Sequence, residues 1–306
     1  MSRVKTVLII VLATTFGVAA AVLAQRDFSK VEIKTEKLAD GVYMLTGSGG
    51  NIGVSAGPDG VLLIDDQFAE LSEKIKAAVA SVSDKPIRFV FNTHWHGDHV
   101  GGNEALANAG ATIVAHDNVR KRMSVEQYIA SMDRKVPPSP EKALPVVTYD
   151  DSVTFHLNGD DIVCFHVPNA HTDGDAIVQF RKANVVHMGD CLFTIGYPRI
   201  DASSGGSING MIAACDRMLG IVGPNTKIIP GHGDLTDKAG MQEYRDMLAK
   251  IRDRVAKAIK AKKTLEQVQA SKPTADLDEK WGKGFIKPEQ IVEVVYQDLS
   301  RGTGKK

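Results

Sequence analysis

The stretch Thr93-His94-Trp95-His96-Gly97-Asp98-His99-Val100-Gly101-Gly102 places three imidazoles and a carboxylate within six consecutive residues. It directly follows the apolar run Ile87–Phe91, whose β-branched and aromatic residues predict a buried strand. The polar side chains therefore lie in a loop at the end of a strand. Imidazole and carboxylate together suit zinc, iron or manganese. A solvated polar loop is the alternative, but the spacing H-x-H-x-D-H favours a metal site.

The sequence on both sides of this loop alternates between strand and helix patterns. The expected strands cover residues 31–37, 42–46, 51–56, 61–65, 87–91, 112–115, 152–157, 161–167, 176–180, 185–188 and 227–229. The expected helices cover residues 70–82, 105–109, 118–132, 210–221, 238–263, 265–269 and 288–299. Each half of the chain runs several strands and then a helix. We therefore predict an α/β fold of four layers, an αββα sandwich with two mixed sheets face to face.

Three further loops after predicted strands carry metal-competent side chains. His171 follows the strand that ends at Val167, and His232 follows the short strand at 227–229. The adjacent Asp190 and Cys191 follow the strand at 185–188. A single histidine in a Gly-rich loop is more often solvated than bound to a metal. Because the arrangement recurs at several strand ends, where functional residues concentrate, we expect these side chains to converge on one site.

These motifs, in this order and at these separations, resemble those of the metallo-β-lactamase superfamily of metallohydrolases. The matching elements are His94-x-His96-x-Asp98-His99, His171, Gly189-Asp190 and Gly231-His232-Gly233, within roughly residues 31–248. The resemblance implies an αββα sandwich with two metal ions at its edge, usually zinc, ahead of iron or manganese. By the same resemblance His94, His96 and His171 hold the first metal. Asp98, His99 and His232 hold the second, and Asp190 bridges the two.

The adjacent pair Asp190-Cys191 leaves one ligand open. In one branch of lactamases a cysteine replaces the aspartate, whereas this sequence has both residues side by side. Because neighbours in an extended segment point to opposite sides, we predict Asp190 as the ligand, with Cys191 as the alternative. Thr194 stands where those lactamases often place a lysine for the substrate carboxylate. This departure argues against β-lactam recognition by that route.

Two other stretches have more than one interpretation. Asp65 either orients a ligand histidine or the loop that carries it, or simply caps the following helix or a turn. The Gly/Ser-rich segment 203–207 precedes a predicted helix and could hold an anionic group of the substrate through backbone N–H groups. The alternative, which we favour, is an ordinary loop in which Ser207 caps the helix.

The chemistry that the resemblance implies is hydrolysis. Two metal ions share a water whose pKa falls to about 7, and Asp98 is the expected catalytic residue that orients this nucleophile. We expect a zinc-dependent hydrolase that opens an amide or ester bond of a small molecule, such as a β-lactam or a lactone. A thioesterase of the glyoxalase II type is the alternative. A diiron or non-hydrolytic metal protein on the same scaffold ranks lower.

The first 24 residues differ from the rest of the chain. Arg3 and Lys5 precede an apolar run that ends in small residues, which predicts a signal peptide at 1–24 rather than a retained anchor. We therefore expect a periplasmic or secreted protein, without membrane contact after cleavage. A metallo-β-lactamase-like domain at 25–250 and a helical extension at 251–306, packed on the same domain, follow. Balanced charge gives no indication of a nucleic-acid partner, and the oligomeric state stays open.

Overall fold

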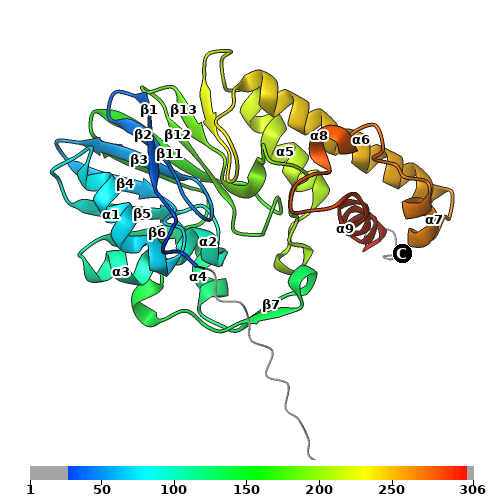
Figure 1. Cartoon of the computed structure of the whole chain (residues 1–306), viewed down its shortest axis with the longest axis horizontal. Helices are drawn as coiled ribbons and strands as arrows, with labels where there is room; N and C mark the ends of the chain where they lie inside the picture. The colour runs from blue at the N-terminus through cyan, green and yellow to red at the C-terminus, as the bar shows by residue number, and fades with distance from the viewer. Residues whose placement is uncertain (1–26, 302–306) are drawn as a thin grey trace, which may run out of the picture.

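Two β-sheets lie face to face at the centre of the molecule, and helices cover their outer sides (Figure 1). The computed structural model describes residues 27–301, so the predicted signal peptide lies outside the described residues. The first sheet has the strand order β1-β2-β3-β4-β5-β6-β9, and the second has the order β10-β11-β12-β13-β14. The predicted αββα sandwich is confirmed.

The strands and helices begin and end close to the expected positions. The strands of the first sheet are β1 Lys34–Ala39, β2 Val42–Thr46, β3 Ile52–Gly57, β4 Gly60–Ile64, β5 Ile87–Asn92, β6 Thr112–His116 and β9 Val147–Tyr149. Those of the second are β10 Ser152–Leu157, β11 Asp160–His166, β12 Ala176–Phe180, β13 Val185–His187 and β14 Lys227–Ile229. The helices are α1 Ser72–Ala80, α2 Gly97–Val100, α3 Asn103–Asn108, α4 Asp117–Met123, α5 Ile208–Leu219, α6 Lys238–Lys260, α7 Leu265–Ala270, α8 Asp278–Trp281 and α9 Pro288–Arg301.

Apolar side chains fill three layers. The central layer lies between the sheets, where Ile64 and Phe91 of the first sheet belong to the same buried cluster as Ile162 and Val178 of the second. A second cluster lies beneath α1 and α3, on the outer side of the first sheet. A third lies beneath α5 and α6, on the outer side of the second. The strands of a sandwich buried on both faces read as continuous apolar runs, as β4 does.

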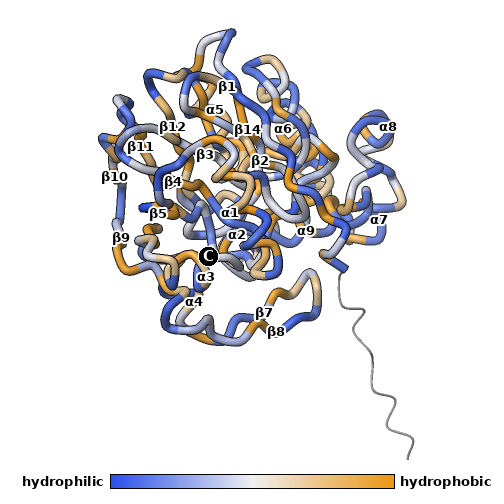
Figure 2. Tube along the Cα trace, turned by 60° about the vertical axis from the view of Figure 1, so that its left-hand side comes forward, coloured by the Kyte–Doolittle hydropathy of each residue, from blue (hydrophilic) through white to orange (hydrophobic). Residues whose placement is uncertain are grey.

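The segment predicted as a helix at 118–132 is different in the structure, and this prediction is wrong. Helix α4 ends at Met123, and the chain then forms a hairpin of β7 Gln127–Ile129 and β8 Arg134–Val136. Both views show this hairpin along the lower side of the molecule (Figures 1 and 2). Tyr128 and Ile129 favour strands, and Asp133 in the left-handed region (φ 45°) reverses the chain. The short β9 and α8 were not predicted.

The C-terminal helices continue the outer layer of the second sheet. The expected boundary after residue 250 lies within α6, which runs through it without a break. Ile291 and Val295 of α9 belong to the same buried cluster as Met247 and Ile251 of α6. Pro288 begins α9, as its fixed φ favours. Within residues 27–301, no helix is both long and apolar enough to cross a bilayer.

Candidate metal centre

The predicted ligands come from loops at one edge of the sandwich. His94 and His96 follow the carboxyl end of β5, and the short α2 carries Asp98 and His99. β4, β5 and β6 are parallel, so their carboxyl ends meet at the same edge. In the second sheet, β13 and β14 are parallel and β11 runs in the same direction as both. The loops after these strands carry His171, Asp190 and His232.

The structure brings all seven residues together in two neighbouring groups. In each group the potential ligand atoms lie within 4.8 Å of one another. We call His94, His96 and His171 the first ligand group, which Asp190 accompanies. Asp98, His99 and His232 form the second ligand group. The first is fully buried, whereas Asp98 and His232 of the second are partly exposed to solvent.

Hydrogen bonds fix which nitrogen of His96 and His171 is protonated. His171 Nδ1 lies 2.7 Å from the carbonyl oxygen of Arg199, which can only accept, so this nitrogen carries the proton. His96 Nε2 donates in the same way to the Asp201 carboxylate at 2.9 Å. In neutral rings, His171 Nε2 and His96 Nδ1 are then bare, yet they face each other at 2.8 Å. Two lone pairs that face each other at this distance repel, and a cation bound by both nitrogens would remove that repulsion.

His94 and His99, the other two histidines of the H-x-H-x-D-H motif, are also held through one ring nitrogen. Asp65 accepts from the Thr93 hydroxyl at 2.7 Å, which leaves that oxygen to accept from His94 Nδ1 at 3.1 Å. Asp65 also accepts from His99 Nδ1 at 2.7 Å. The Nε2 atoms of His94 and His99 are therefore directed at the site. Of the two interpretations of Asp65, the structure supports the one in which it orients ligand histidines.

Burial and charge affect the two ligand groups in opposite directions. Burial lowers the pKa of His94 and His96, and it lowers that of His171 to about 3, so these rings are neutral. Burial would also lower the pKa of His99, but Asp190 and Asp65 together raise it well above its ordinary value. A metal ion that binds at the second group would therefore have to displace a proton from His99.

Asp190 lies between the two groups. Its Oδ2 is 3.4 Å from His171 Nε2 and 3.8 Å from His94 Nε2. Its Oδ1 is 3.2 Å from His99 Nε2 and 3.4 Å from His232 Nε2, and this buried oxygen accepts no hydrogen bond of acceptable geometry. One oxygen thus faces each ligand group. These contacts, the convergent bare nitrogens and the donor set fit a pair of metal ions bridged by a carboxylate.

Cys191 points elsewhere. Its side chain is buried in the cluster beneath α5 and α6, and Cys215 of α5 contacts its carbonyl oxygen at 3.9 Å. Burial raises the pKa of the Cys191 thiol well above its ordinary value, which disfavours the thiolate that binds metals. The residue belongs to neither ligand group among the described residues. The geometry therefore favours Asp190 over Cys191.

At the site, loops from the two sheets approach each other closely because glycines leave room for them. A Cβ on Gly231 would lie 2.1 Å from Asp190 Oδ1, and one on Gly50 would lie 2.2 Å from the His99 ring. Asn51 follows Gly50 and donates its amide to the carbonyl oxygens of Pro230 and Gly233. The His232 loop is therefore tied directly to the first sheet. Only glycine permits these approaches.

Three residues that the sequence reasoning left without a role also shape the site. Asp201 accepts from His96, as described above. Asp175 accepts from the backbone N–H of His171 at 2.6 Å, and burial raises its pKa to about 8. Arg199 has buried Nε and Nη2 atoms that find no hydrogen-bond partner among the described residues. Asp175 and Asp201 each follow a motif loop in the sequence. Only the structure shows which ring or amide each carboxylate contacts.

The Gly/Ser-rich segment has the structural role that we favoured. The Ser207 hydroxyl accepts from the Gly210 N–H and caps α5. Ser203 and Ser204 donate to the Asp201 carboxylate, so their N–H groups already have a partner. Thr194 donates its hydroxyl to the Asp234 carbonyl oxygen at 3.0 Å and brings no positive charge to the site.

Comparison with known proteins matches this fold and these motifs. The family model described as the metallo-beta-lactamase superfamily matches residues 45–256, which is more than half of the chain. The chain belongs to the metallo-beta-lactamase superfamily. The solved structure of a metallo-beta-lactamase from Pontibacter korlensis superposes with a TM-score of 0.57 at 18% identity, covering 71% of this chain and 99% of that one. At that identity the likeness concerns the fold.

Curated relatives within the superfamily carry two kinds of name. A hydroxyacylglutathione hydrolase from Nitrosococcus oceani is 29% identical over 159 residues, which is 51% of this chain and 52% of that protein. A metallo-beta-lactamase type 2 from Bacteroides fragilis is 25% identical over 244 residues, which is 75% of this chain and 90% of that protein. The match to the first relative spans only about half of its length. Both names are those of hydrolases.

Proposed function

We propose that this superfamily member is an exported zinc-dependent hydrolase that opens an amide or ester bond in a small molecule of the β-lactam or lactone kind. The observation that carries the proposal is the pair of ligand groups joined by Asp190, with bare imidazole nitrogens that converge without a proton between them. A bound pair of zinc ions would supply hydroxide at neutral pH and polarise the scissile carbonyl.

The residues of the chain divide the remaining tasks. Asp98 is the partly exposed acid of the second ligand group, with its Oδ2 3.5 Å from His232 Nε2. Burial raises the pKa of Asp98, but His99 and His232 lower it more, so the carboxylate is charged. It is placed to orient the attacking water and to accept its proton. Asp65 and Asp175 hold the loops that carry the histidines.

A cavity beside the site favours a substrate with a negatively charged group. The cavity has a volume of about 400 Å³ and lies between residues 198–203, the β7–β8 hairpin region and α9. Arg199 is among the residues that line it, and Phe285 adds an exposed ring. The Arg199 Nε and Nη2 atoms are buried and have no hydrogen-bond partner among the described residues. A substrate carboxylate would pair with this guanidinium. We therefore expect Arg199, rather than Thr194, to supply the cation that a β-lactam carboxylate requires.

The alternative function is hydrolysis of a thioester of the glyoxalase II type. It is favoured by the match to hydroxyacylglutathione hydrolases and by Asp190 facing the site instead of Cys191. Export argues against it, since thioesters are mostly intracellular, but the N-terminal segment that suggests export lies outside the described residues.

The test is a substrate panel on zinc-loaded protein, with protein stripped of metal as the matched control. Turnover of β-lactams or lactones that is lost on stripping and regained with zinc supports the proposal. Turnover of lactoylglutathione alone would establish the alternative instead. A loaded protein that hydrolyses none of the three classes contradicts both.

A further inference from the structure

We propose that Asp201 is a positioning residue whose carboxylate fixes His96 for the first metal and whose backbone N–H holds the His171 loop, while Asp65 serves the rest of the H-x-H-x-D-H motif. This inference rests on the proposed metal-dependent function. It concerns a carboxylate outside the two ligand groups, on the segment that follows the Asp190 loop.

The segment Arg199–Asp201 touches the two histidines at three points. The Asp201 carboxylate accepts from His96 Nε2 at 2.9 Å. The Asp201 backbone N–H donates to the carbonyl oxygen of His171 at 3.0 Å. The Arg199 carbonyl oxygen accepts from His171 Nδ1 at 2.7 Å. The two ring contacts leave the opposite ring nitrogen bare and directed at the site, so the segment sets both the tautomer and the orientation of the rings. The backbone contact holds the His171 loop against the segment.

Asp201 is itself held in place by its surroundings. It is 1% exposed, and its Oδ1 accepts from the backbone N–H groups of Ser203 and Ser204. Its Oδ2, which meets His96, also accepts from the Ser204 hydroxyl at 2.8 Å. That hydroxyl accepts in turn from the Trp95 indole N–H at 3.2 Å. Since Trp95 lies between His94 and His96, the network returns to the motif from which it started.

The C-terminal helices brace this segment from the other side. Arg301 of α9 donates to the Ala202 carbonyl oxygen at 3.3 Å. The Tyr197 N–H donates to the Trp281 carbonyl oxygen at 2.9 Å, and its hydroxyl donates to Asp278 of α8 at 2.8 Å. Figure 1 shows α9 beside the loop that precedes α5. The extension beyond α6 therefore supports the residue that orients the first ligand group.

Two carboxylates thus divide the histidines between them. Asp65 follows β4 of the first sheet and orients His99 directly and His94 through Thr93. Asp201 belongs to the second half of the chain and orients the His96 ring through its carboxylate, while its backbone N–H holds the carbonyl oxygen of His171. A carboxylate that only capped residues 202–204 would need its contacts with Ser203 and Ser204 but not the contact with His96. This difference allows the two roles to be separated.

The experiment compares Asp201→Asn and Asp201→Ala with Ser203→Ala as the matched control. The asparagine keeps the size of the side chain but not its acceptor-only character, and Ser203→Ala removes a contact on Oδ1 without touching His96. Zinc affinity is measured by competition with a chelator. We expect both Asp201 variants to bind zinc about 10- to 100-fold more weakly, as expected for removal of a carboxylate behind a metal-binding histidine. Ser203→Ala should stay within about twofold of wild type.

A second readout uses the metal-free protein. Nitrogen NMR of the histidine rings should show His96 in the Nε2–H form in wild type and in a mixture of tautomers in Asp201→Ala. Folded Asp201 variants with wild-type zinc affinity would overturn the inference, and Asp201→Asn serves if the alanine variant does not fold. If the wild-type protein binds no zinc, the proposed function fails. The positioning role is then tested by the NMR tautomer of His96 alone, and a mixture of tautomers already present in wild type overturns it.

Discussion

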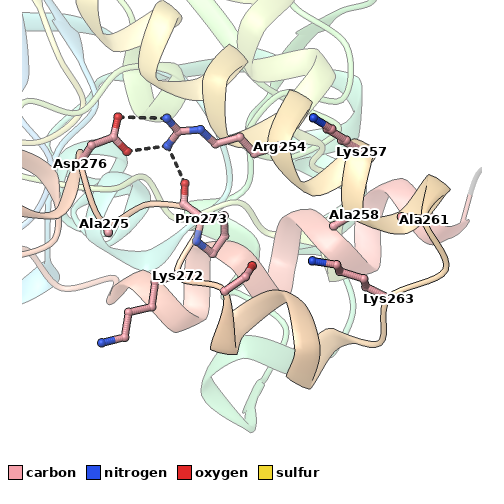
Figure 3. A pocket seen from close by; sticks show the side chains of 10 residues that line it. Arg254, Lys257, Ala258, Ala261, Lys263, Lys272, Pro273, Ala275 and Asp276 are labelled. Carbon is pink, nitrogen blue, oxygen red and sulfur yellow. Dashed lines mark hydrogen bonds and ion pairs between the residues drawn. The ribbon is translucent and has the colours of Figure 1, made fainter.

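The candidate metal centre and the groove between α6 and the α7–α8 connection both gather ionisable side chains. The groove has a volume of about 470 Å³ and is lined by Arg254, Asp276 and several lysines. Figure 3 shows Arg254 reaching from α6 to the Asp276 carboxylate and to the Pro273 carbonyl oxygen. Each polar group in these hydrogen bonds has a partner, and about half of the Asp276 side chain is exposed.

The candidate metal centre differs from this groove in two ways: its side chains are more deeply buried, and some of its polar atoms lack hydrogen-bond partners. Its ligand atoms are mostly buried, bare nitrogens of His96 and His171 face each other, and Asp190 Oδ1 accepts no hydrogen bond. Buried polar atoms without partners are costly, and a fold tolerates them where a bound group completes them. The presence of ionisable side chains alone would not have separated the two places. The unsatisfied atoms do, and the following predictions test that difference.

The largest effect is expected for Asp190→Ala. Because each oxygen of Asp190 faces one ligand group, its loss should remove binding at the second group and lower kcat/KM by at least about 100-fold. Cys191→Ala is the control, since its buried thiol belongs to neither ligand group and meets only the backbone of His171 among their residues, and it should keep activity within about threefold. Metal content and turnover measured together test this pair. The reverse pattern would make Cys191 the ligand.

The next effect concerns pH. Burial lowers the pKa of His99 and His232, but nearby carboxylates raise it by more, which favours the protonated rings. Asp190 acts on both rings, Asp65 on His99 and Asp98 on His232. A metal ion must displace these protons, so zinc affinity there should rise with pH across the neutral range. The first group is neutral and should bind without proton release.

Calorimetric zinc titration in two buffers of different ionisation enthalpy measures the protons released. Release confined to one of two binding events supports the division between the groups. Equal release in both events would mean that the histidines of the first group are also protonated before metal binds.

The sequence predicted most of the fold and the seven residues that the structure gathers in the two groups, because both have local signatures. Apolar alternation placed the strands, and H-x-H-x-D-H names its ligands within six residues. The hairpin at 127–136 was missed because its strands have three residues each, too few to show a period. Asp201 was missed because its partner lies 105 residues away. No local pattern distinguishes an aspartate that orients a histidine from one that caps a turn.

A smaller effect is expected for Gly231→Ala. The new Cβ would lie 2.1 Å from Asp190 Oδ1, so the His232 loop must shift, at a cost of about 1–3 kcal/mol and with weaker zinc binding. Gly223→Ala is the matched control, because its Cβ would meet only Thr226 Oγ1 at 3.9 Å. Thermal unfolding and zinc titration of both variants make the comparison. Equal behaviour of the two would show that the loop is not tightly packed against Asp190.

The smallest effect is expected in the groove of Figure 3. Arg254 lowers the pKa of Asp276 to about 2. A lowered carboxyl pKa contributes stability above its unfolded value of about 4, and this contribution is lost as the pH falls through about 2. Solvent screens so exposed a pair, so Arg254→Ala should lower the free energy of unfolding by no more than about 1 kcal/mol at neutral pH. Urea denaturation at pH 7 and pH 2 measures it, and zinc binding and turnover should be unchanged. A loss of turnover in this variant would mean that the groove affects the metal centre. The paired, exposed charges of the groove would then have a functional role.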